Sequence, residues 1–221
     1  MKVLVIAPHM DDEVLGCGAT IARHIEQKDE VSVCFIAHRV YHHKYDEEKN
    51  RFEMECARNA QKILGYTGVK FLGLNDERLD LCLQDILIPL EEYVSTVNPE
   101  VVYLNHKGDN NQDHRAVFQA SMVALRPSAN PGIKKIYCYE VSSSTEQAPP
   151  VLEQIFFPNY YVNIEKYFKL KLDATRCYRT ETRDFPHPRS TEALEILAKK
   201  RGIDIGFRMA EAFMVLREKW D

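Results

Sequence analysis

Short aliphatic runs alternate with longer amphipathic segments over the first 141 residues, and this alternation constrains the fold more than any other feature of the sequence. The first run, residues 2–7, is followed directly by Pro8. Continuous apolar runs of this length are typical of strands that are buried on both faces of a parallel sheet. Strands that alternate with helices predict an α/β fold: a doubly wound, mostly parallel, Rossmann-like sheet between two layers of helices, in a three-layer sandwich.

The alternation also sets the order of the expected elements. The expected strands are residues 2–7, 30–37, 69–72, 100–104 and 135–141, and the expected helices are residues 11–27, 47–64, 80–97 and 114–125. Pro89 predicts a kink or a break in the third of these helices. Beyond residue 141 two segments have a helical pattern, 164–178 and 190–201, and a last one, 210–216, fits a strand or a helix. We expect one domain over residues 1–221, in which residues 142–221 form a C-terminal cap on the doubly wound core of residues 1–141.

Charge and hydropathy exclude several classes of protein. The chain has 29 Lys and Arg against 33 Asp and Glu, a net charge of −4, so we do not expect a nucleic-acid binder with a generally basic surface. No apolar run approaches the roughly 20 residues of a membrane-spanning helix, and the apolar start of the chain lacks the cleavage site of a signal peptide. The six cysteines are far apart, which favours reduced thiols in a cytoplasmic protein over a cysteine-based zinc site. The sequence is compatible with a homo-oligomer.

Two polar clusters follow the ends of two expected strands. Residues 8–13 (PHMDDE) come after the first strand, and residues 105–114 (NHKGDNNQDH) come after the strand at 100–104. In a doubly wound sheet, ligands bind beyond the carboxyl ends of the strands. Both clusters should therefore meet at one edge of the sheet.

The residue types in these clusters suit a catalytic metal. His9 and Asp12 are three residues apart at a strand-to-helix turn, and imidazole and carboxylate groups are both zinc ligands. A catalytic zinc typically has three protein ligands and an open water position, and His114 offers the third ligand. Asp113 is adjacent to His114, and its carboxylate can orient a histidine ligand by accepting the N–H of the ring nitrogen that does not bind the metal. Asp11 diverges from Asp12, so it can stand beside the metal as a base.

Other interpretations of the first cluster have to be weighed. The H-x-D-D pattern also fits a helix N-cap with an incidental histidine. A nucleotide-binding module would need a glycine-rich phosphate loop after the first strand, where this chain is anionic. The sequence from Gly16 to Gly18 is too short for a dinucleotide fingerprint, and close packing of a helix on the sheet explains it better.

Several motifs resemble those of one enzyme family. Residues 7–18 (APHMDDEVLGCG) are similar to the PHxDDExxxGxG opening of the LmbE-like, PIG-L zinc de-N-acetylases. Residues 109–115 (DNNQDHR) resemble the second zinc motif of that family, which ends in DH. Residues 51–57 (RFEMECA), with ILG at 63–65, resemble its R-x-x-E-x-x-x-A helix. Arg201-Gly202 and residues 210–213 resemble its C-terminal signature.

The resemblance implies roles for individual residues. It implies that His9, Asp12 and His114 bind zinc, or another divalent metal, and that Asp11 is the general base. It also implies that two further residues contact the substrate, Arg51 on the R-x-x-E helix and Asp76 after the third strand.

One departure from the family pattern concerns the proton for the leaving amine. Many members have H-P-D-H in the second motif, whereas this chain has Asn111 at the first position. An amide can donate a hydrogen bond to an oxyanion but cannot shuttle a proton. The proton therefore comes from His106, from His187, or from Asp11 acting first as base and then as acid. Arg189, beside His187, is a further candidate for contact with the substrate.

The function that the resemblance implies is hydrolysis of an N-acetyl group. The expected substrate is a small molecule, an N-acetylglucosamine-type amino sugar or its conjugate, and the product is acetate. A metal hydrolase of another amide or of an ester is the alternative, and a nucleotide-binding module is the less favoured one. The sequence does not specify the group attached to the sugar.

Overall fold

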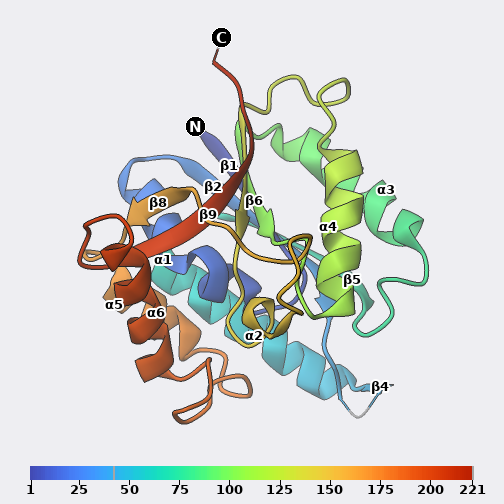
Figure 1. Cartoon of the computed structure of the whole chain (residues 1–221). Coiled ribbons are helices and arrows are strands. Elements are labelled where there is room, and N and C mark those ends of the chain that lie inside the picture. Colours follow the sequence, from blue (N-terminus) through green and yellow to red (C-terminus); the bar gives the residue numbers. More distant parts are fainter. Residues whose placement is uncertain (42, 221) are drawn as a thin grey trace.

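The computed structural model describes residues 1–41 and 43–220 (Figure 1). In that part of the chain, seven strands form one sheet in the order β5-β2-β1-β6-β7-β9-β8. The five strands from the N-terminal region pair in parallel, whereas β9 is antiparallel to both β7 and β8. The strands are β1 (Lys2–Ala7), β2 (Glu30–His38), β5 (Gly68–Asn75), β6 (Val101–Asn105), β7 (Lys135–Tyr139), β8 (Tyr160–Asn163) and β9 (Ala210–Glu218). The predicted doubly wound, mostly parallel sheet is confirmed.

Helices cover both faces of this sheet and make the predicted three layers. Side chains alternate along β1, so that Val3 and Val5 lie in one apolar core while Leu4 and Ile6 lie in the other. The first core is closed by α1 (Asp12–Glu26), α2 (Glu47–Leu64), α5 (Phe168–Thr175) and α6 (Thr191–Ile203), and the second by α3 (Leu83–Val97) and α4 (Gln112–Ala124). Figure 1 shows α3 and α4 to the right of the sheet and the other helices to its left and below.

Helix α1 is kinked where it crosses the sheet. Cys17 has non-helical torsion angles (φ −145°, ψ 23°) inside the helix. A Cβ atom at Gly16 would lie 2.1 Å from the ring of Tyr139, so only glycine permits this approach. Close packing of the helix on the sheet is thus confirmed at Gly16, whereas Gly18 faces Lys171 of α5.

Several elements differ from the sequence-based expectation. Helix α3 continues through Pro89, because Ile86, Leu90 and Val94 form a buried stripe that holds it to the sheet. Helix α4 begins at Gln112, since the side-chain oxygen of Asn111 accepts the N–H of Asp113 and caps the helix. The chain after residue 141 contributes β8 and β9 to the same sheet, so it extends the sheet as well as covering it. A short hairpin, β3 (Val40–Tyr41) with β4 (Lys44–Tyr45), and a 3₁₀ turn, η1 (Thr145–Gln147), were not expected.

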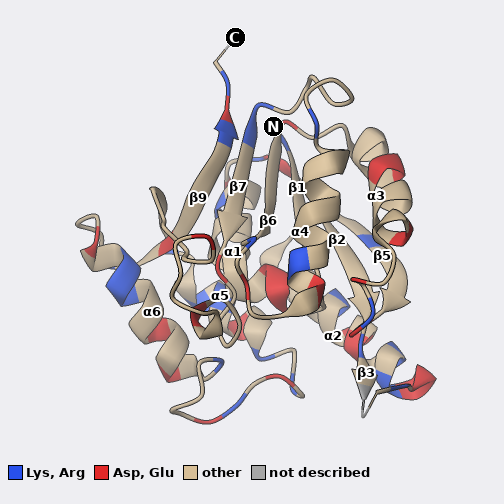
Figure 2. Ribbon diagram, turned by 45° about the vertical axis from the view of Figure 1, so that its right-hand side comes forward, with Lys and Arg blue, Asp and Glu red and all other residues tan. Residues whose placement is uncertain are grey.

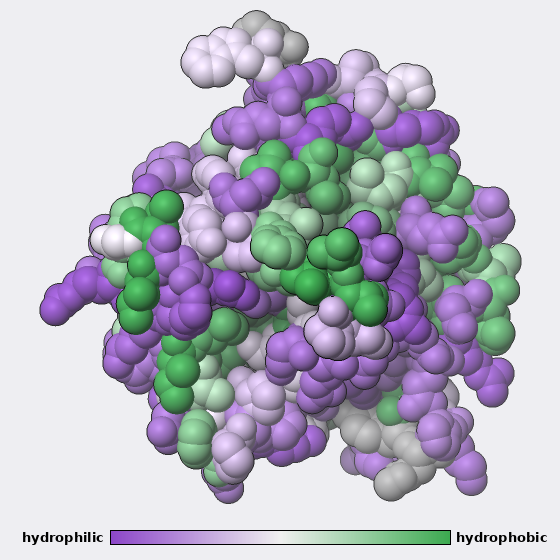
Figure 3. Space-filling view, in the orientation of Figure 1, coloured by the Kyte–Doolittle hydropathy of each residue, from purple (hydrophilic) through white to green (hydrophobic). Residues whose placement is uncertain are grey.

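The surface carries both signs of charge and scattered apolar groups. Figure 2 shows basic and acidic segments on most elements, with an acidic segment in the first turn of α4. The face seen in Figure 3 is mainly hydrophilic, with apolar patches at its centre and left. Among the helices of the described residues, none is long and apolar enough to cross a membrane.

Candidate metal centre and active site

The carboxyl ends of β1 and β6 bring the two polar clusters together. The two strands are parallel neighbours in the sheet, so the loops that follow them leave at the same edge. His9 follows β1, Asp12 starts α1, and His114 lies in the first turn of α4 after β6. All three side chains are buried, and Figure 1 shows α1 and α4 starting near the same edge of the sheet.

The three side chains present their ligand atoms at the spacing of a metal site. His9 Nδ1 lies 3.2 Å from His114 Nε2 and 3.4 Å from Asp12 Oδ2, and His114 Nε2 lies 3.2 Å from Asp12 Oδ2. A tetrahedral zinc with bonds of roughly 2.0–2.1 Å holds its ligand atoms about 3.3 Å apart. The three atoms therefore have the spacing that three ligands of a tetrahedral zinc would need, and such an ion would keep one position for water or substrate.

Carboxylates hold the far side of each imidazole. His9 Nε2 lies 2.9 Å from Asp76 Oδ1 and 3.4 Å from Asp113 Oδ2. His114 Nδ1 lies 3.1 Å from Asp109 Oδ2. An acceptor behind one ring nitrogen keeps the proton there and leaves the lone pair of the other nitrogen for a metal. The chemistry of the donor set thus fits a divalent cation.

The electrostatics of the cluster also favour a cation. Although burial opposes it, the surrounding carboxylates Asp113, Asp12 and Asp76 raise the pKa of His9 well above its ordinary value. Burial likewise opposes protonation of His114, yet Asp12 and Asp109 raise its pKa to about 9. The buried carboxylates thus favour positive charge at the two imidazoles. A divalent ion would supply that charge.

Asp11 stands beside the cluster in a strained conformation. Its φ of 125° lies in a region that non-glycine residues rarely adopt, and such strain costs of order 1–3 kcal/mol. Its backbone N–H donates to Glu13 Oε2 at 3.2 Å. Burial raises the pKa of the Asp11 carboxyl to about 6, against the lowering effect of Arg189 and Arg39. Oδ1 of Asp11 is buried and, within the described residues, has no hydrogen-bond partner, so it is available to accept a proton.

The C-terminal segment brings Arg189 to this aspartate. Arg189 Nη1 donates to Asp11 Oδ2 at 2.7 Å and to Glu181 at 2.6 Å, while its Nε donates to the Ser143 hydroxyl at 2.7 Å. His187 lies in the same turn, where its Nδ1 accepts the backbone N–H of Arg189 at 3.1 Å. The proposed contact of His187 with the leaving amine would therefore use its other ring nitrogen, Nε2, and it stays a prediction.

The other two candidates near the leaving amine have local partners. His106 Nε2 lies 3.0 Å from the carbonyl oxygen of Gln154, and the ring meets Phe156 edge-on. This contact commits His106 to the loop that contains Gln154. Because the Asn111 side-chain oxygen caps α4, its amide nitrogen is the donor that remains for an oxyanion.

The structure does not bring Arg51 to the cluster. Its side chain is 77% exposed and pairs with Glu47 at 3.1 Å along the outer face of α2. The buried face of this helix carries Asn50, Glu53 and Ala57. The family pattern places its arginine three residues before the acid and seven before the alanine, which falls on Asn50 in this chain. The assignment of the motif arginine to Arg51 is therefore one residue out of register, and this chain has asparagine at that place.

Asp76 has a partner that sequence reasoning did not give it. Oδ1 of Asp76 contacts His9, so the main contact of Asp76 is with a proposed metal ligand. Asp76 also borders a cavity of about 480 Å³ at the same sheet edge, together with Tyr45 and Arg78. A contact with substrate stays a prediction.

Two residues of the site were missed in the sequence. Asp109 backs His114 and is itself held by the hydroxyls of Ser144 and Thr145. Its position five residues before His114 in one polar loop was an available signal. Arg39 lies 3.6 Å from Asp11 Oδ2 and follows β2, the third strand that ends at this edge.

Comparisons with known proteins agree with the motifs. The model of the family described as PIG-L: GlcNAc-PI de-N-acetylase matches residues 4–125, more than half of the chain. A relative from Escherichia coli (strain K12), the uncharacterized deacetylase YaiS, is 34% identical over 184 residues, which cover 80% of this chain and 90% of the relative.

Solved structures share the fold at lower identity. N,N'-diacetylchitobiose deacetylase from Pyrococcus horikoshii superposes with a TM-score of 0.76 at 22% identity, over 97% of this chain and 83% of that one. The 4-carboxy-2-hydroxymuconate hydratase GalB from Pseudomonas putida KT2440 has a TM-score of 0.73 at 22% identity, over 100% of this chain and 98% of that one. One fold thus carries more than one reaction, and the family assignment rests on the sequence matches. By those matches the chain belongs to the GlcNAc-PI de-N-acetylase (PIG-L) family of deacetylases.

Proposed function

We propose that the chain is a zinc-dependent amidohydrolase that removes the N-acetyl group of an N-acetylglucosamine-type amino sugar, or of its conjugate, and releases acetate. The observation that carries this proposal is the triangle of ligand atoms from His9, Asp12 and His114, with edges of 3.2–3.4 Å and a buried carboxylate beside it. The family description and the chitobiose deacetylase on the same fold support an amino-sugar substrate.

His9, Asp12 and His114 would hold the zinc. A bound zinc lowers the pKa of water and polarises the acetyl carbonyl. Asp11 accepts the water proton through Oδ1, the oxygen that lacks a partner within the described chain. Arg189 holds the other oxygen of Asp11 and so fixes the orientation of the carboxylate.

Asn111 and the start of α4 would stabilise the negative charge on the acetyl oxygen. The amide nitrogen of Asn111 is free of the cap, and a helix N-terminus favours an anion. The leaving amine takes its proton from Asp11 or from Nε2 of His187. His106 is less suited, because its Nε2 contacts the Gln154 carbonyl.

The proposed site of the sugar ring is a cavity next to these residues. The cavity bordered by Asp76, Tyr45 and Arg78 measures about 480 Å³, within the range of about 300–1,000 Å³ that small-molecule sites occupy. It adjoins the metal cluster through Asp76, whose carboxylate contacts His9. A substrate in this cavity would lie beside the metal cluster.

The test is acetate release by zinc-loaded protein from a panel of N-acetylated sugars: free, nucleotide-linked and lipid-linked. Acetylated peptides, esters and a hydratable unsaturated acid complete the panel. We expect turnover of amino sugars that is lost in His114→Ala together with bound zinc. His24→Gln is the control, because it changes a buried imidazole that pairs with Asp29 and Tyr103. This variant should keep both its turnover and its bound zinc. Turnover of esters alone, or hydration without acetate release, would contradict the proposal.

A further inference from the structure

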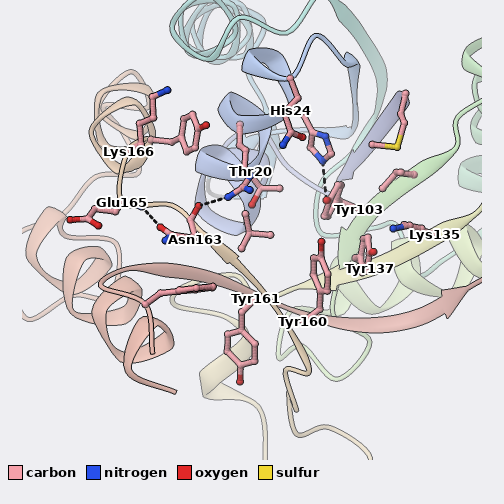
Figure 4. A pocket seen from close by; sticks show the side chains of 17 residues that line it. Thr20, His24, Tyr103, Lys135, Tyr137, Tyr160, Tyr161, Asn163, Glu165 and Lys166 are labelled. Atoms are coloured by element: carbon pink, nitrogen blue, oxygen red, sulfur yellow. Dashed lines mark hydrogen bonds between the residues drawn. The ribbon is translucent and has the colours of Figure 1, made fainter. Parts of the chain in front are cut away.

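A second cavity lies at the opposite end of the same strands (Figure 4). It measures about 850 Å³ and is bordered by Met1, Val101 and Lys135, which stand at or just before the starts of β1, β6 and β7. β1 has six residues, so at roughly 3.3 Å per residue it separates this cavity from His9 by about 20 Å. The cavity is therefore distinct from the metal cluster.

Aromatic side chains from three strands form one wall. Tyr137 on β7 stacks against Tyr103 on β6, with ring centroids 5.3 Å apart, and against Tyr160 on β8, with centroids 4.7 Å apart. His24 of α1 faces this wall, and its Nε2 lies 3.0 Å from the hydroxyl oxygen of Tyr103. Figure 4 shows Tyr103, Tyr137 and Tyr160 side by side below His24, whereas the hydroxyl of Tyr161 points away from them.

One hydroxyl of this wall is left without a partner. Tyr137 is 1% exposed, and its hydroxyl makes no hydrogen bond within the described part of the chain. A buried polar group in this state is unfavourable, because it has lost its hydrogen bonds to water. A ligand in the cavity that reaches this hydroxyl, which lies next to the ring of Tyr160, would supply the missing hydrogen bond.

The charged groups around the cavity are already paired. Lys135 pairs with Glu218 at 3.0 Å, Lys166 pairs with Glu26, and Arg23 donates to the Asn163 carbonyl at 3.1 Å. These cations are therefore committed to the protein, and they give a phosphate or carboxylate ligand little advantage. Burial also raises the pKa of Tyr103 well above its ordinary value, so its phenol is neutral.

We propose that this cavity binds a neutral carbohydrate ring, at a site separate from the catalytic one. A phenol hydroxyl both donates and accepts hydrogen bonds, as each sugar hydroxyl does. The apolar parts of the tyrosine rings suit the C–H groups of a sugar. The volume lies within the range of small-molecule sites. This inference does not rest on the proposed deacetylation, since it concerns other residues.

Titration calorimetry of the zinc-loaded protein with glucose, methyl glucoside and maltose tests it, because these sugars have no N-acetyl group to hydrolyse. We expect saturable binding that Tyr137→Phe weakens about 5- to 10-fold, the effect of one hydrogen bond. Tyr160→Ala should weaken it further. Tyr161→Phe is the matched control: its hydroxyl lies 3.3 Å from the Pro158 carbonyl, and its removal should leave the affinity unchanged. Acetate release should be the same in all three variants.

Several results would overturn the proposal. One is the absence of saturable sugar binding by the wild-type protein, and another is equal affinity in Tyr137→Phe and Tyr161→Phe. Tighter binding of glucose 6-phosphate than of glucose would show an anion site instead. A dimer that Tyr160→Ala dissociates, without sugar binding, would show that the aromatic wall is a contact between copies.

Discussion

Two buried clusters of charged groups lie along α1, and they are built in opposite ways. At the kink of the helix, Glu211 accepts the N–H groups of Ala19 and Thr20 at 3.1 and 2.7 Å, and it accepts the Thr20 hydroxyl at 2.6 Å. Lys171 completes this cluster, with its ammonium 2.7 Å from Glu211 and 2.7 Å from the Leu15 carbonyl. Both oxygens of Glu211 are therefore partnered.

The cluster at the first turn of α1 is left incomplete. One oxygen each of Asp11 and Asp12 is buried and lacks a hydrogen-bond partner in the described chain. Nitrogens of His9 and His114 face each other at 3.2 Å, and Asp11 has a positive φ. Buried polar groups are normally satisfied, so unsatisfied and strained groups gathered in one place point to function. The kink cluster satisfies its own charges inside the fold, whereas the first-turn cluster has unsatisfied groups that a cation and a substrate would use under the proposed function.

The largest effect is expected from a substitution at Asp11, which should remove the function of the first-turn cluster and leave the kink cluster unchanged. Asp11→Asn keeps the shape of the side chain but cannot accept the water proton. We expect kcat/KM to fall by about 10² to 10⁴, the usual contribution of a general base. Zinc content measured beside the activity should stay near that of the wild type. Full turnover would remove Asp11 from the mechanism, and zinc loss would make it a support of the ligands.

The matching change in the kink cluster should affect stability. Lys171→Met leaves Glu211 buried without its cation, and breaking a buried pair in this way costs about 3–5 kcal/mol. Chemical denaturation measures this loss in the free energy of unfolding, and the protein that stays folded should keep its turnover.

The control for this change lies on the same helix. Lys169 pairs with Asp173 at 3.0 Å, but its side chain is 87% exposed. Lys169→Met should therefore cost less than about 1 kcal/mol. Equal losses in the two variants would show that Glu211 does not need Lys171.

Much of the first-turn cluster was readable in the sequence, whereas the kink cluster was not. Aliphatic runs ended by Pro8 and by the polar loop at residues 105–114 indicated where parallel strands end, and that placed His9, Asp12 and His114 at one edge. The periodicity of a strand fixes its faces, so the two cores could be expected before the fold was known.

Other features depended on contacts that no local pattern encodes. The commitment of His106 to Gln154 comes from a loop without periodicity, 48 residues away in the chain. Glu211 reaches α1 from a strand that is 191 residues distant from Thr20. The register of α2 was present in the sequence, since Asn50, Glu53 and Ala57 follow the helical period, but a motif match one residue out of register hid it.

A smaller effect is expected at the carboxylate that backs a metal ligand. Asp109 Oδ2 lies 3.1 Å from His114 Nδ1. Asp109→Asn removes the charge behind the ring, and such partners are typically worth 10- to 100-fold in metal affinity. Competition with a chromophoric chelator measures the change.

Asp29 supplies the control for that measurement. It pairs with Nδ1 of His24 at 2.7 Å, in the same Asp–His arrangement but at the other end of α1. Asp29→Asn should leave zinc affinity unchanged. If both variants lose affinity alike, the loss reflects general destabilisation and Asp109 has no specific role.

The smallest expected effect concerns the pKa of the histidine in each of these two Asp–His pairs. His114 has a second carboxylate, Asp12, close to its other nitrogen, and its pKa rises to about 9 although burial opposes this. For His24 burial prevails over the carboxylate of Asp29, and its pKa is lowered. An unfolded histidine takes up its proton near pH 6.5, whereas the folded His24 resists it. The stability contributed by neutral His24 is thus present above pH 6.5 and is lost as the pH falls through its folded pKa.

Between pH 7 and 5 the free energy of unfolding should therefore fall more in the wild type than in His24→Gln. Denaturation at pH 8 gives the cost of the substitution itself, because His24 is then neutral in both states. A difference between the two proteins that is the same at pH 8 and pH 5 would show that His24 titrates alike in the folded and unfolded chains.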